Sequence, residues 1–492
     1  MIAATDSRRT LDEILAAHAT MLLATVEAGS SHLTETPFAA QGEGDGLTLV
    51  YMVGEDSSAL VALRRRTGVA FTVGTPGDAV WLEGTGRAVI VHDAHVAADY
   101  LAALVARSPD TTMSAATLRV VRIVPETITV ARRQGADIVA QPVTFAPAVG
   151  RWGYPGGTFN QRFQRFAEVT RADVAPVMAM PVAIGAALAW ERGGKFKPLS
   201  FAFTLVGAVA AHLAANVTND IFDFRSGADE RARAMAATDG TLDTSSGALT
   251  GGAFSERQAN LVAVGLWATA LLCGADVARR SGPGIIVLAG AGFALGTLYV
   301  APPLAYGYIG HGLGEAGILA SFGVLPVLGS YYAQTGRFDW QPLLAALPPG
   351  LFTTDVLFNH HFFHWRSDKA VGKMTPVAVL GEEKAGEYSR AVLIASCVAI
   401  LAGVVARVYP STALSGLAAT AGVLEKLDQL GAGGKEQAFY GNLMDRTVKG
   451  SSRMGLYLII SLVVSGIWKR VRNRSASGND QAIAAARNER VA

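Results

Sequence analysis

Two groups of polar side chains stand out because their spacing places them on one side of a helix. In the stretch AHLAANVTNDIFDFRSGADERAR, a rotation of about 100° per residue brings Asn216, Asn219, Asp220 and Asp223 within about 100° of arc. These oxygens follow an apolar segment and form a hard-oxygen surface suited to Mg²⁺ that also binds substrate phosphates. The alternative is helix capping at a membrane exit. We favour the metal site, because acids buried near a membrane are costly and usually functional.

The second group lies in TTDVLFNHHFFHWRSDKAVGKMTP. If helix continues through it, His361, His364 and Asp368 share one face. His360 points about 100° away from His361 and reads as a packed or lipid-interface residue. Asp355 belongs to another face, and the sequence shows no partner that would give it a role.

Charged residues beside both groups suit the recognition of phosphate oxygens. Arg225 and Asp229 follow the first group, and Lys369 and Lys373 follow the second. Arginine and lysine are the usual phosphate-binding side chains. The alternatives are a solvated surface arginine and lysines that only flank a membrane span.

The composition indicates that membrane helices position these groups. Charged residues make up 17% of the 492 residues, against about 25% in soluble proteins, and the mean hydropathy is +0.31. The two cysteines exclude a disulfide framework and a Cys-rich metal site. A net charge of +2 gives no basic patch for nucleic acid.

The chain divides into a strand-rich part up to about residue 143 and a part with long uncharged segments from about residue 174. With an internal N-terminus, more lysines and arginines fall in the inside loops, although the basic stretch from Lys469 to Arg474 would lie outside. The first residues lack the features of a secretory signal, so we expect the first domain in the cytoplasm. Nine segments are candidate spans: 174–190, 199–219, 258–275, 283–303, 316–336, 341–358, 391–406, 408–424 and 454–468.

The first part reads as six strands with alternating apolar residues and two helices. The strands are LLATVEAG, HLTETPFAA, GLTLVYMVG, GVAFTVG, AVWLEGTGRAVIV and LRVVRIVPETITV, and the helices are SSALVALRRR and AHVAADYLAALVAR. A linker rich in Pro, Gly and aromatic residues follows, and the segment 159–171 reads as an amphipathic helix on the membrane surface.

The stretch ANVTNDIFDFRSGAD resembles the first Asp-rich motif of the UbiA superfamily of intramembrane prenyltransferases, in particular the 1,4-dihydroxy-2-naphthoate polyprenyltransferase branch. LYVAPPLAYGYIGHGLGEAGILASFGVLPVLGSYYAQTG and DKAVGKMTPVAVLG resemble further segments of that family. The resemblance implies Mg²⁺-dependent transfer of a polyprenyl group from a diphosphate to an aromatic acceptor of menaquinone-like biosynthesis. It implies metal ligands at Asn216, Asp220, Asp223 and Asp368, and substrate contacts at Asn219, Arg225, Asp229, Tyr299, Lys369 and Lys373.

The chain departs from the family at two positions. The family usually has an acid where this chain has His364, and it often has a basic residue where this chain has Ala305. Imidazole is a poor Mg²⁺ ligand and a good proton acceptor. Either the second metal site rests mainly on Asp368, or His361 and His364 act as catalytic bases on the acceptor. Tyr299 and Tyr306 are candidates to face the allylic cation.

The strand order of the first part resembles the pyridoxamine 5′-phosphate oxidase-like split β-barrel, which often holds FMN at a dimer interface. The resemblance implies FMN contacts at Ser57, Arg64 and Arg65, and a homodimer formed through the barrel. The family often has Ser-x-Lys-x-x-Asn-Leu here, whereas Ala59 and Ala62 occupy the Lys and Asn positions. The alternative is a barrel kept for dimerisation or regulation.

The expected architecture is therefore a multi-domain chain with a split β-barrel and an all-α membrane domain of about nine helices. We expect a multi-pass protein of the plasma membrane. A transporter and a membrane-anchored flavin reductase are the alternative functions. The expected divisions are a barrel at 1–140, a linker and interfacial helix at 141–170, a UbiA-like transmembrane domain at 171–470 and a polar tail at 471–492.

Overall fold

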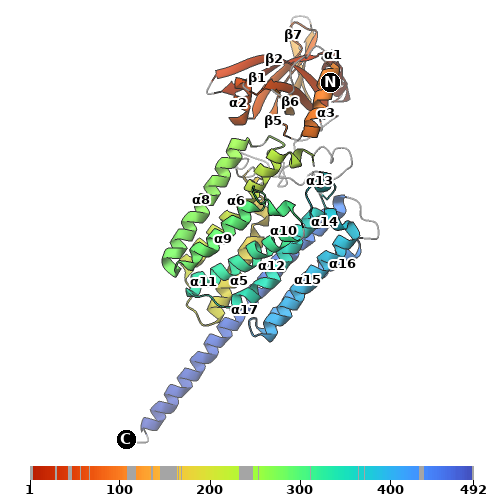
Figure 1. Ribbon diagram of the computed structural model, residues 1–492. Coiled ribbons are helices and arrows are strands. Elements are labelled where there is room, and N and C mark those ends of the chain that lie inside the picture. Colours follow the sequence, from red (N-terminus) through yellow and green to blue (C-terminus); the bar gives the residue numbers. More distant parts are fainter. Residues whose placement is uncertain are drawn as a thin grey trace. The chain divides into compact units, whose positions relative to one another are not determined.

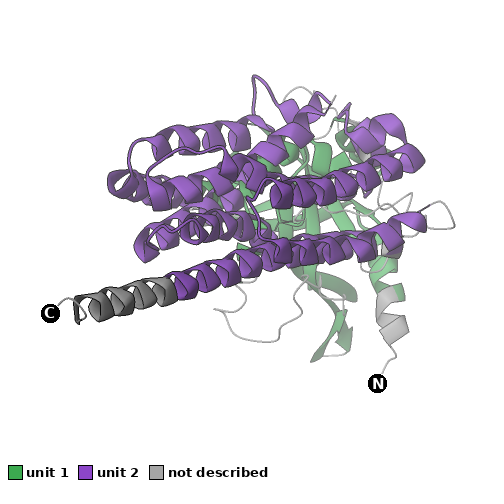
Figure 2. Ribbon diagram, turned by 90° about the horizontal axis from the view of Figure 1, so that it is seen from below, with its two compact units in different colours: residues 1–172, 216–263 green, residues 173–215, 264–492 purple. Residues whose placement is uncertain are grey.

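The structure of the protein is a computed structural model that forms two compact units. The first unit comprises Met1–Ala172 and Asn216–Ala263, and the second comprises Asp173–Ala215 and Val264–Ala492 (Figure 2). The residues described are 4–27, 30–42, 47–55, 57–65, 67–92, 94–107, 118–134, 137–143, 163, 166–167, 169–231, 248–252, 254–310, 312–363, 365–370, 372–430 and 437–489.

The first unit contains an antiparallel sheet of seven strands in the order β3-β2-β1-β4-β5-β6-β7 (Figure 1). Pairing of β3 with β6 closes the sheet into a barrel. The strands are β1 (Thr20–Glu27), β2 (Ser30–Gln41), β3 (Thr48–Gly54), β4 (Gly68–Val73), β5 (Val80–Ile90), β6 (Leu118–Gln134) and β7 (Asp137–Val143).

Alternating side chains fill the barrel. In β4 the side chains of Val69, Phe71 and Val73 are buried, and the residues between them are more exposed. A register shift between Thr85 and Gly86 interrupts the pairing of β5 with β6. A Cβ at Gly86 would lie 2.6 Å from the carbonyl oxygen of Val124, so only glycine fits at this bulge.

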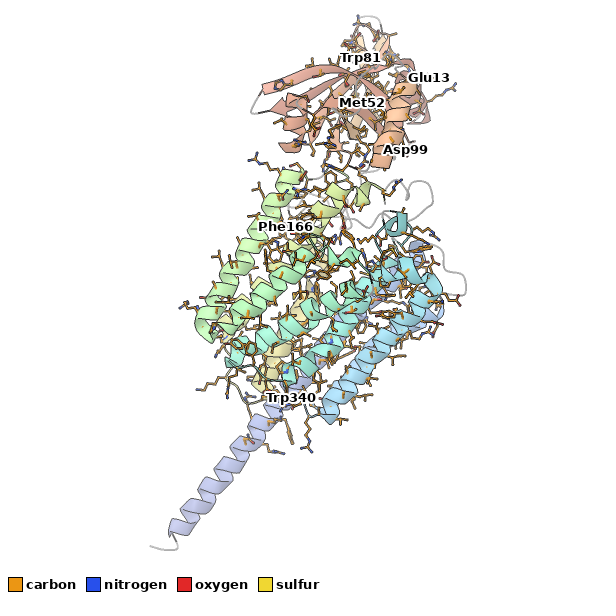
Figure 3. All side chains as sticks on the ribbon, viewed as in Figure 1. Glu13, Met52, Trp81, Asp99, Phe166 and Trp340 are labelled. Atoms are coloured by element: carbon orange, nitrogen blue, oxygen red, sulfur yellow. The ribbon has the colours of Figure 1, made fainter. Side chains whose placement is uncertain are left out.

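The six predicted strands and both predicted helices, α2 (Ser58–Arg65) and α3 (Ala94–Arg107), are present. The seventh strand and helix α1 (Ala4–Ala17) were not predicted. Strand β7 occupies the sheet edge, and only Val143 is buried, so its sequence has no alternating apolar pattern. Helix α1 could have been predicted from its sequence, because Leu11, Ile14 and Leu15 have helical spacing. These three side chains pack into the barrel core. Trp81 of β5 is buried, and its Nε1 donates to Glu83 over 3.0 Å (Figure 3).

Beyond the barrel, most of the residues that the structure describes are helical (Figure 1). Four short 3₁₀ or π segments, η3 (Ala172–Val174), η4 (Tyr306–Tyr308), η5 (Leu319–Val324) and η6 (Ser411–Thr420), connect or extend the helices. The α-helices are α5 (Ala175–Glu191), α6 (Pro198–Ser226), α8 (Glu256–Ser281), α9 (Gly284–Leu298), α10 (Leu313–Ile318), α11 (Leu325–Thr335), α12 (Gln341–His361), α13 (Trp365–Ala370), α14 (Pro376–Leu380), α15 (Glu382–Val405), α16 (Ala421–Asp428) and α17 (Gln437–Glu489).

The expected count of nine spans is not confirmed. Among the described residues, six helices are long and apolar enough to cross a membrane: Ala172–Glu191, Pro198–Ser226, Glu256–Ser281, Leu313–Thr335, Glu382–Val405 and Phe439–Asn473. The other three expected segments do form helix, but α9 has 15 residues, α12 has Pro348 and Pro349 in its interior, and η6 is a 3₁₀ segment. Large apolar side chains remain exposed on the long helices, such as Leu271 at 74% and Val405 at 84%. These are surfaces suited to lipid.

The helices of the second unit pack through small residues. Helix α5 packs against α11 and α17, and α12 packs against α15 and α17. A Cβ at Gly185 of α5 would collide with the carbonyl oxygen of Val327 in α11. Glycine at this position therefore permits the close approach of the two helices.

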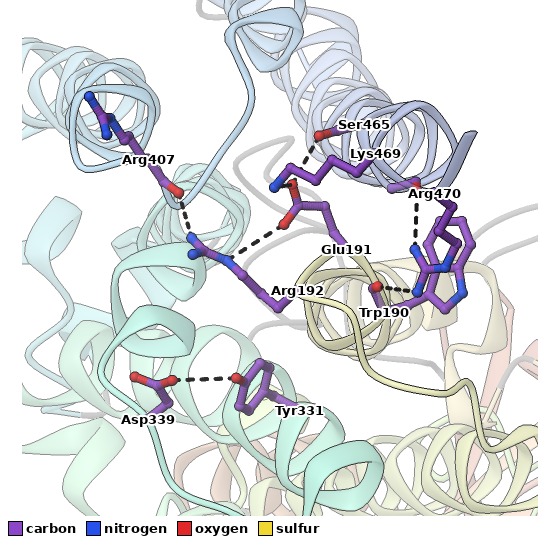
Figure 4. Close-up of polar contacts among 10 residues, drawn as sticks. Trp190, Glu191, Arg192, Tyr331, Asp339, Arg407, Ser465, Lys469 and Arg470 are labelled. Atoms are coloured by element: carbon purple, nitrogen blue, oxygen red, sulfur yellow. Dashed lines mark hydrogen bonds and ion pairs between the residues drawn. The ribbon is translucent and has the colours of Figure 1, made fainter. Parts of the chain in front are cut away.

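A charged cluster fixes the C-terminal end of α5 to α17 (Figure 4). Glu191 is 6% exposed, and one of its oxygens lies 2.5 Å from Nζ of Lys469 and 2.9 Å from Oγ of Ser465. The Arg470 guanidinium lies 3.9 Å from the Trp190 ring and donates to its carbonyl oxygen over 2.7 Å. Lys469 and Arg470 begin the basic stretch that the predicted topology placed outside the membrane. Both residues therefore have partners within the helical bundle.

Candidate active site

The first acidic group lies at the end of α6, which continues to Ser226 as the sequence predicts. Asp220 and Asp223 are 2% and 7% exposed. Nδ2 of Asn219 donates to Oδ2 of Asp223 over 2.9 Å, one helical turn away. The helix end therefore presents two buried carboxylates with an amide beside them.

Residues that directly precede α5 contact this acidic face. Arg171 adopts a left-handed conformation with φ of 52°, and its NH2 lies 2.6 Å from Oδ1 of Asp220. Nδ2 of Asn216 donates to the carbonyl oxygen of Thr170 over 3.0 Å. Thr170 in turn donates to the carbonyl oxygen of Phe166 over 2.7 Å. Of the expected interfacial helix at 159–171, the described residues 163, 166–167 and 169–170 are helical.

Arg171 is a site residue that the sequence did not indicate. It reads as a charge that flanks a membrane span, and 49 residues separate it from Asp220. Its left-handed backbone, which is uncommon for a residue with a Cβ, directs the chain toward the acidic face. The guanidinium neutralises a carboxylate that is otherwise buried.

Arg225 contacts a residue of the next helix in the structure. It forms an ion pair of 2.5 Å with Glu256 at the start of α8 and is exposed on its other side. Asp229 is half-buried two residues before the described segment ends at Arg231. Both residues belong to the same unit as Asp220 and Asp223.

The second group is arranged differently from the prediction. Helix α12 ends at His361 and α13 begins at Trp365, so no continuous helix joins His361 to Asp368. The chain turn still brings His361 Nδ1 to 3.8 Å from Asp368 Oδ2. His361 is 5% and Asp368 8% exposed, whereas His360 is half-buried. His364 lies outside the described residues.

Asp368 is the centre of this second group. Its carboxylate accepts a hydrogen bond of 3.3 Å from Oγ1 of Thr375 and lies 3.9 Å from Nζ of Lys373. The backbone N–H of Lys373 donates to the Asp368 carbonyl oxygen over 2.8 Å. The predicted residue Lys369 is exposed. Thr375 is a neighbour of Asp368 that was not among the residues predicted from the sequence.

The turn after α9 packs on the second group. Nζ of Lys373 lies 4.8 Å from the centre of the Tyr308 ring, and the N–H of Met374 donates to the Tyr308 carbonyl oxygen over 3.2 Å. Tyr299 and Tyr306 form an edge-to-face pair with ring centres 5.3 Å apart. Aromatic faces and a lysine therefore lie next to one another in this unit.

Asp355, which the sequence left without a role, lies at the centre of a buried network. It is 0% exposed and accepts from Ser389 Oγ over 2.6 Å and from Asn359 Nδ2 over 3.0 Å. Asn359 also donates to Thr447 Oγ1 over 3.1 Å. The network joins α12, α15 and α17, so we assign it to helix packing.

Replacing Ser389 with Ala is expected to lower the free energy of unfolding by about 1–3 kcal/mol, because the buried Asp355 carboxylate loses a hydrogen-bond donor. Unfolding of the protein in mixed detergent micelles with increasing SDS measures the change. Ser415→Ala is the matched control, since Ser415 is exposed and bonds only locally to the Thr412 carbonyl oxygen. Equal stability of the two variants would contradict a structural role for the network.

The residue types fit a divalent cation at the end of α6, although within the described residues no three His, Cys, Asp or Glu side chains converge on one point. Asp220 and Asp223 supply hard oxygen ligands, and Asn216 and Asn219 supply amide oxygens. The Arg171 guanidinium occupies a position beside Asp220 where a positive charge is required. A cation that displaced Arg171 would likewise neutralise the buried Asp220 carboxylate.

Of the residues expected to bind FMN, Ser57 and Arg64 have described side chains. Ser57 Oγ accepts the N–H of Leu60 over 3.1 Å and so caps α2. Arg64 is exposed, and the Arg65 side chain lies outside the described residues. Glu55, close to Ser57 in the sequence, pairs with Arg119 over 2.8 Å. The hydrogen-bond arrangement is that of a capped helix.

The fold and the polar helix ends define a membrane protein with an attached β-barrel, and comparison with protein families agrees. The UbiA prenyltransferase family matches residues 178–440, and the family described as pyridoxamine 5′-phosphate oxidase matches residues 8–131. Because the first match covers more than half of the chain, the protein belongs to the UbiA prenyltransferase family. It carries an N-terminal domain like pyridoxamine 5′-phosphate oxidase.

Individual relatives match the membrane part. The 2-carboxy-1,4-naphthoquinone phytyltransferase of Synechocystis sp. is 30% identical over 205 residues, which are 42% of this chain and 62% of that relative. The 1,4-dihydroxy-2-naphthoate octaprenyltransferase of Escherichia coli is 29% identical over 248 residues, 49% of this chain and 76% of that relative. The chain thus spans less than two thirds of the first relative.

A solved structure is also similar. The UbiA homolog from Archaeoglobus fulgidus bound to GPP and Mg²⁺ matches with a TM-score of 0.46 and 12% identity, and the match covers 61% of this chain and 99% of that one.

Proposed function

We propose that the protein transfers a polyprenyl group from an isoprenoid diphosphate to an aromatic acceptor of the naphthoate type, as in menaquinone-like biosynthesis. Family membership and the names of the two relatives support this reaction class. The observation that carries the proposal is the pair of buried carboxylates at the end of α6, each less than a tenth exposed. Buried acids at a membrane helix end suit a metal–diphosphate site.

We assign Mg²⁺ to Asp220 and Asp223 with Asn216, and to Asp368 in the second group. When bound, the ion neutralises charge on the diphosphate and makes it a better leaving group. Asn219, Arg225 and Asp229 lie beside the first acids, and Lys369 and Lys373 beside Asp368. The cationic side chains among them supply donors to the diphosphate oxygens.

The remaining residues act on the carbon skeleton and on the acceptor. The allylic C–O bond breaks, the diphosphate leaves with the electron pair, and the acceptor ring forms the new C–C bond. The substituted ring carbon then releases its proton, or CO₂ if the carboxylate is replaced, and the ring regains its aromaticity. The faces of Tyr299 and Tyr306 stabilise positive charge on the allylic group. His361 or His364 accepts the phenolic proton, and the loss of this proton raises the nucleophilicity of the ring.

We further propose that the bilayer is the plasma membrane and that the barrel is cytoplasmic. The chemistry takes place in the transmembrane part, for which we keep the division 171–470. The barrel serves dimerisation or regulation. We keep FMN contacts at Ser57, Arg64 and Arg65 as a second proposal for the barrel, supported by the family match over residues 8–131.

Arg171→Met is expected to make stability depend on Mg²⁺. Asp220 is 2% exposed, and a buried charge without its partner costs several kcal/mol. Since Arg171 is itself partly exposed, we expect a loss of about 2 kcal/mol in EDTA and recovery in Mg²⁺. Thermal unfolding in detergent under both conditions measures the effect.

Arg279→Met is the control for that experiment, because its ion pair with Asp276 is exposed. A loss of stability in Arg171→Met that Mg²⁺ leaves unchanged would argue against cation binding at Asp220.

Reconstitution in nanodiscs with radiolabelled geranylgeranyl diphosphate and 1,4-dihydroxy-2-naphthoate tests the function. We expect a prenylated naphthoquinol that forms only with Mg²⁺. The absence of any product, together with uptake of either compound into sealed vesicles, would instead support a transporter. Oxidation of a nicotinamide cofactor without prenyl transfer would support a reductase.

A further inference from the structure

The outer face of the barrel is covered where β3, β5 and β6 meet. Val121 and Ile123 point into the barrel core, so Arg122 between them points outward. Arg122 is nevertheless 2% exposed. The residues that bury its charged end belong to the chain after α6, within the same compact unit.

Arg122 contacts both ends of one connection. Its NH2 lies 3.3 Å from Oε1 of Glu230, which is also 2% exposed, and donates to the carbonyl oxygen of Thr250 over 2.6 Å. Glu230 lies four residues after the end of α6 at Ser226, and Thr250 lies six residues before α8 begins at Glu256. One guanidinium therefore holds the start and the end of the segment between the two helices.

Further contacts fix the same segment. Oγ1 of Thr67 donates to the carbonyl oxygen of Gly252 over 2.7 Å. Gly252 has φ of +69°, and a Cβ there would lie 2.6 Å from Cβ of Arg87 and 3.3 Å from Cγ2 of Val89. Only glycine allows the chain to lie this close to β5.

The end of α6 itself also contacts the barrel. The rings of His92 and Phe224 meet edge to face with centres 4.8 Å apart. Burial lowers the pKa of His92, which keeps this ring neutral and apolar against Phe224. Phe224 is adjacent to Asp223, so the contact reaches the first acidic group.

A buried ion pair is costly to form and strongly destabilising when one partner is lost. Its presence, with bonds to the carbonyl oxygens of Thr250 and Gly252, indicates a surface shaped to hold the two described ends of this connection. The Asp-rich end of α6 leads directly into the residues that Arg122 contacts, because Glu230 lies seven positions after Asp223.

We propose that Arg122 is a positioning residue: it clamps the connection between α6 and α8 on the barrel and so fixes the helix end that carries Asp220 and Asp223. The barrel thereby sets the affinity for the prenyl diphosphate, a role that rests on the proposed function. Binding of the acceptor, whose phenolic proton is removed by a histidine of the second group, does not depend on the clamp.

Arg122→Met in the full-length protein in nanodiscs tests the clamp by two measurements. Hydrogen exchange should become faster in peptides covering 224–231 and 248–256, while the other barrel strands keep their protection. The KM for geranylgeranyl diphosphate should rise about tenfold, with the KM for the naphthoate and kcat changed less than twofold. Arg122→Lys should give intermediate values, since one ammonium cannot match the planar fork.

Arg132→Met is the matched control, because Arg132 lies on the same strand and contacts Thr10 instead. If Arg122→Met does not fold, Glu230→Gln and Thr67→Val weaken the clamp from its other contacts and should raise the same exchange rates and KM. Unchanged exchange in both peptides overturns the proposal, and so does a diphosphate KM equal to wild type. If the wild type transfers no prenyl group, the proposed function fails while the exchange result still decides whether the clamp exists.

Discussion

Replacing Asp223 with Asn is expected to lower the rate of Mg²⁺-dependent prenyl transfer by about 10²–10³-fold, and Asp220→Asn should act similarly. The substitution keeps the size of the side chain and removes the charge that we propose holds Mg²⁺ against the diphosphate. Loss of one preorganised electrostatic contact in a water-poor site costs about this much in rate. The assay is initial-rate transfer of radiolabelled geranylgeranyl diphosphate in nanodiscs.

The dependence on Mg²⁺ separates this explanation from misfolding. The variants should require a higher Mg²⁺ concentration for half-maximal rate, and Asp223→Glu should retain more activity than Asp223→Asn. Asp276→Asn is the control, because this carboxylate is an acid at the other end of α8 that pairs with Arg279 and Arg280. Wild-type rates in both Asp220→Asn and Asp223→Asn would refute the assignment of the acidic face.

The first acidic group could be predicted because its geometry is local. Residues three, four and seven positions apart in an α-helix share a face whatever surrounds them. Helix α6 continues to Ser226, so Asn219 meets Asp223 as the spacing implies. Its counter-ion could not be predicted, because the distance from Arg171 to Asp220 depends on how the chain enters α5.

The second group shows where local geometry fails. The prediction assumed a helix from His361 to Asp368, whereas the chain turns between α12 and α13. His361 and Asp368 still approach to 3.8 Å, but the turn brings them together. Thr375, which follows α13, and Tyr308 of η4 also lie in this group, and a helical projection cannot include them.

Polar contacts between distant segments were the least predictable features. Arg122 and Glu230 are 108 positions apart, and each reads as an ordinary surface charge in its own segment. The buried pair becomes visible only when the barrel and the chain after α6 are seen together. By contrast, the strands of the barrel follow from alternation along the chain, and the one strand missed, β7, has almost no buried side chain.

The neighbours of the few charged residues inside the helical unit indicate whether each charge has a structural or a chemical role. Glu191 pairs with Lys469 and Asp355 lies among hydroxyl and amide groups, so both have structural explanations. Asp368 differs, because its neighbours are a histidine, a lysine and a threonine. A carboxylate with neighbours that move protons and bind anions is suited to chemistry.

His361→Asn is expected to reduce kcat by about 10²-fold and to leave the KM for the diphosphate within about twofold. His361 is 5% exposed and its Nδ1 lies 3.8 Å from Asp368 Oδ2, and we propose that its other ring nitrogen accepts the proton. Asparagine keeps a polar group of similar size but accepts no proton. The deficit should narrow as the pH rises, because the acceptor then loses its phenolic proton to the solvent.

His360→Asn is the control, since the side chain of this adjacent histidine is half-buried on another face. It should retain wild-type kcat across the same pH range. If His361→Asn instead raises the KM for the diphosphate and keeps kcat, His361 binds the leaving group. A deficit that stays constant with pH would also exclude a role of His361 as a base. A rise in pH compensates for a lost base, but it does not compensate for a lost structural contact.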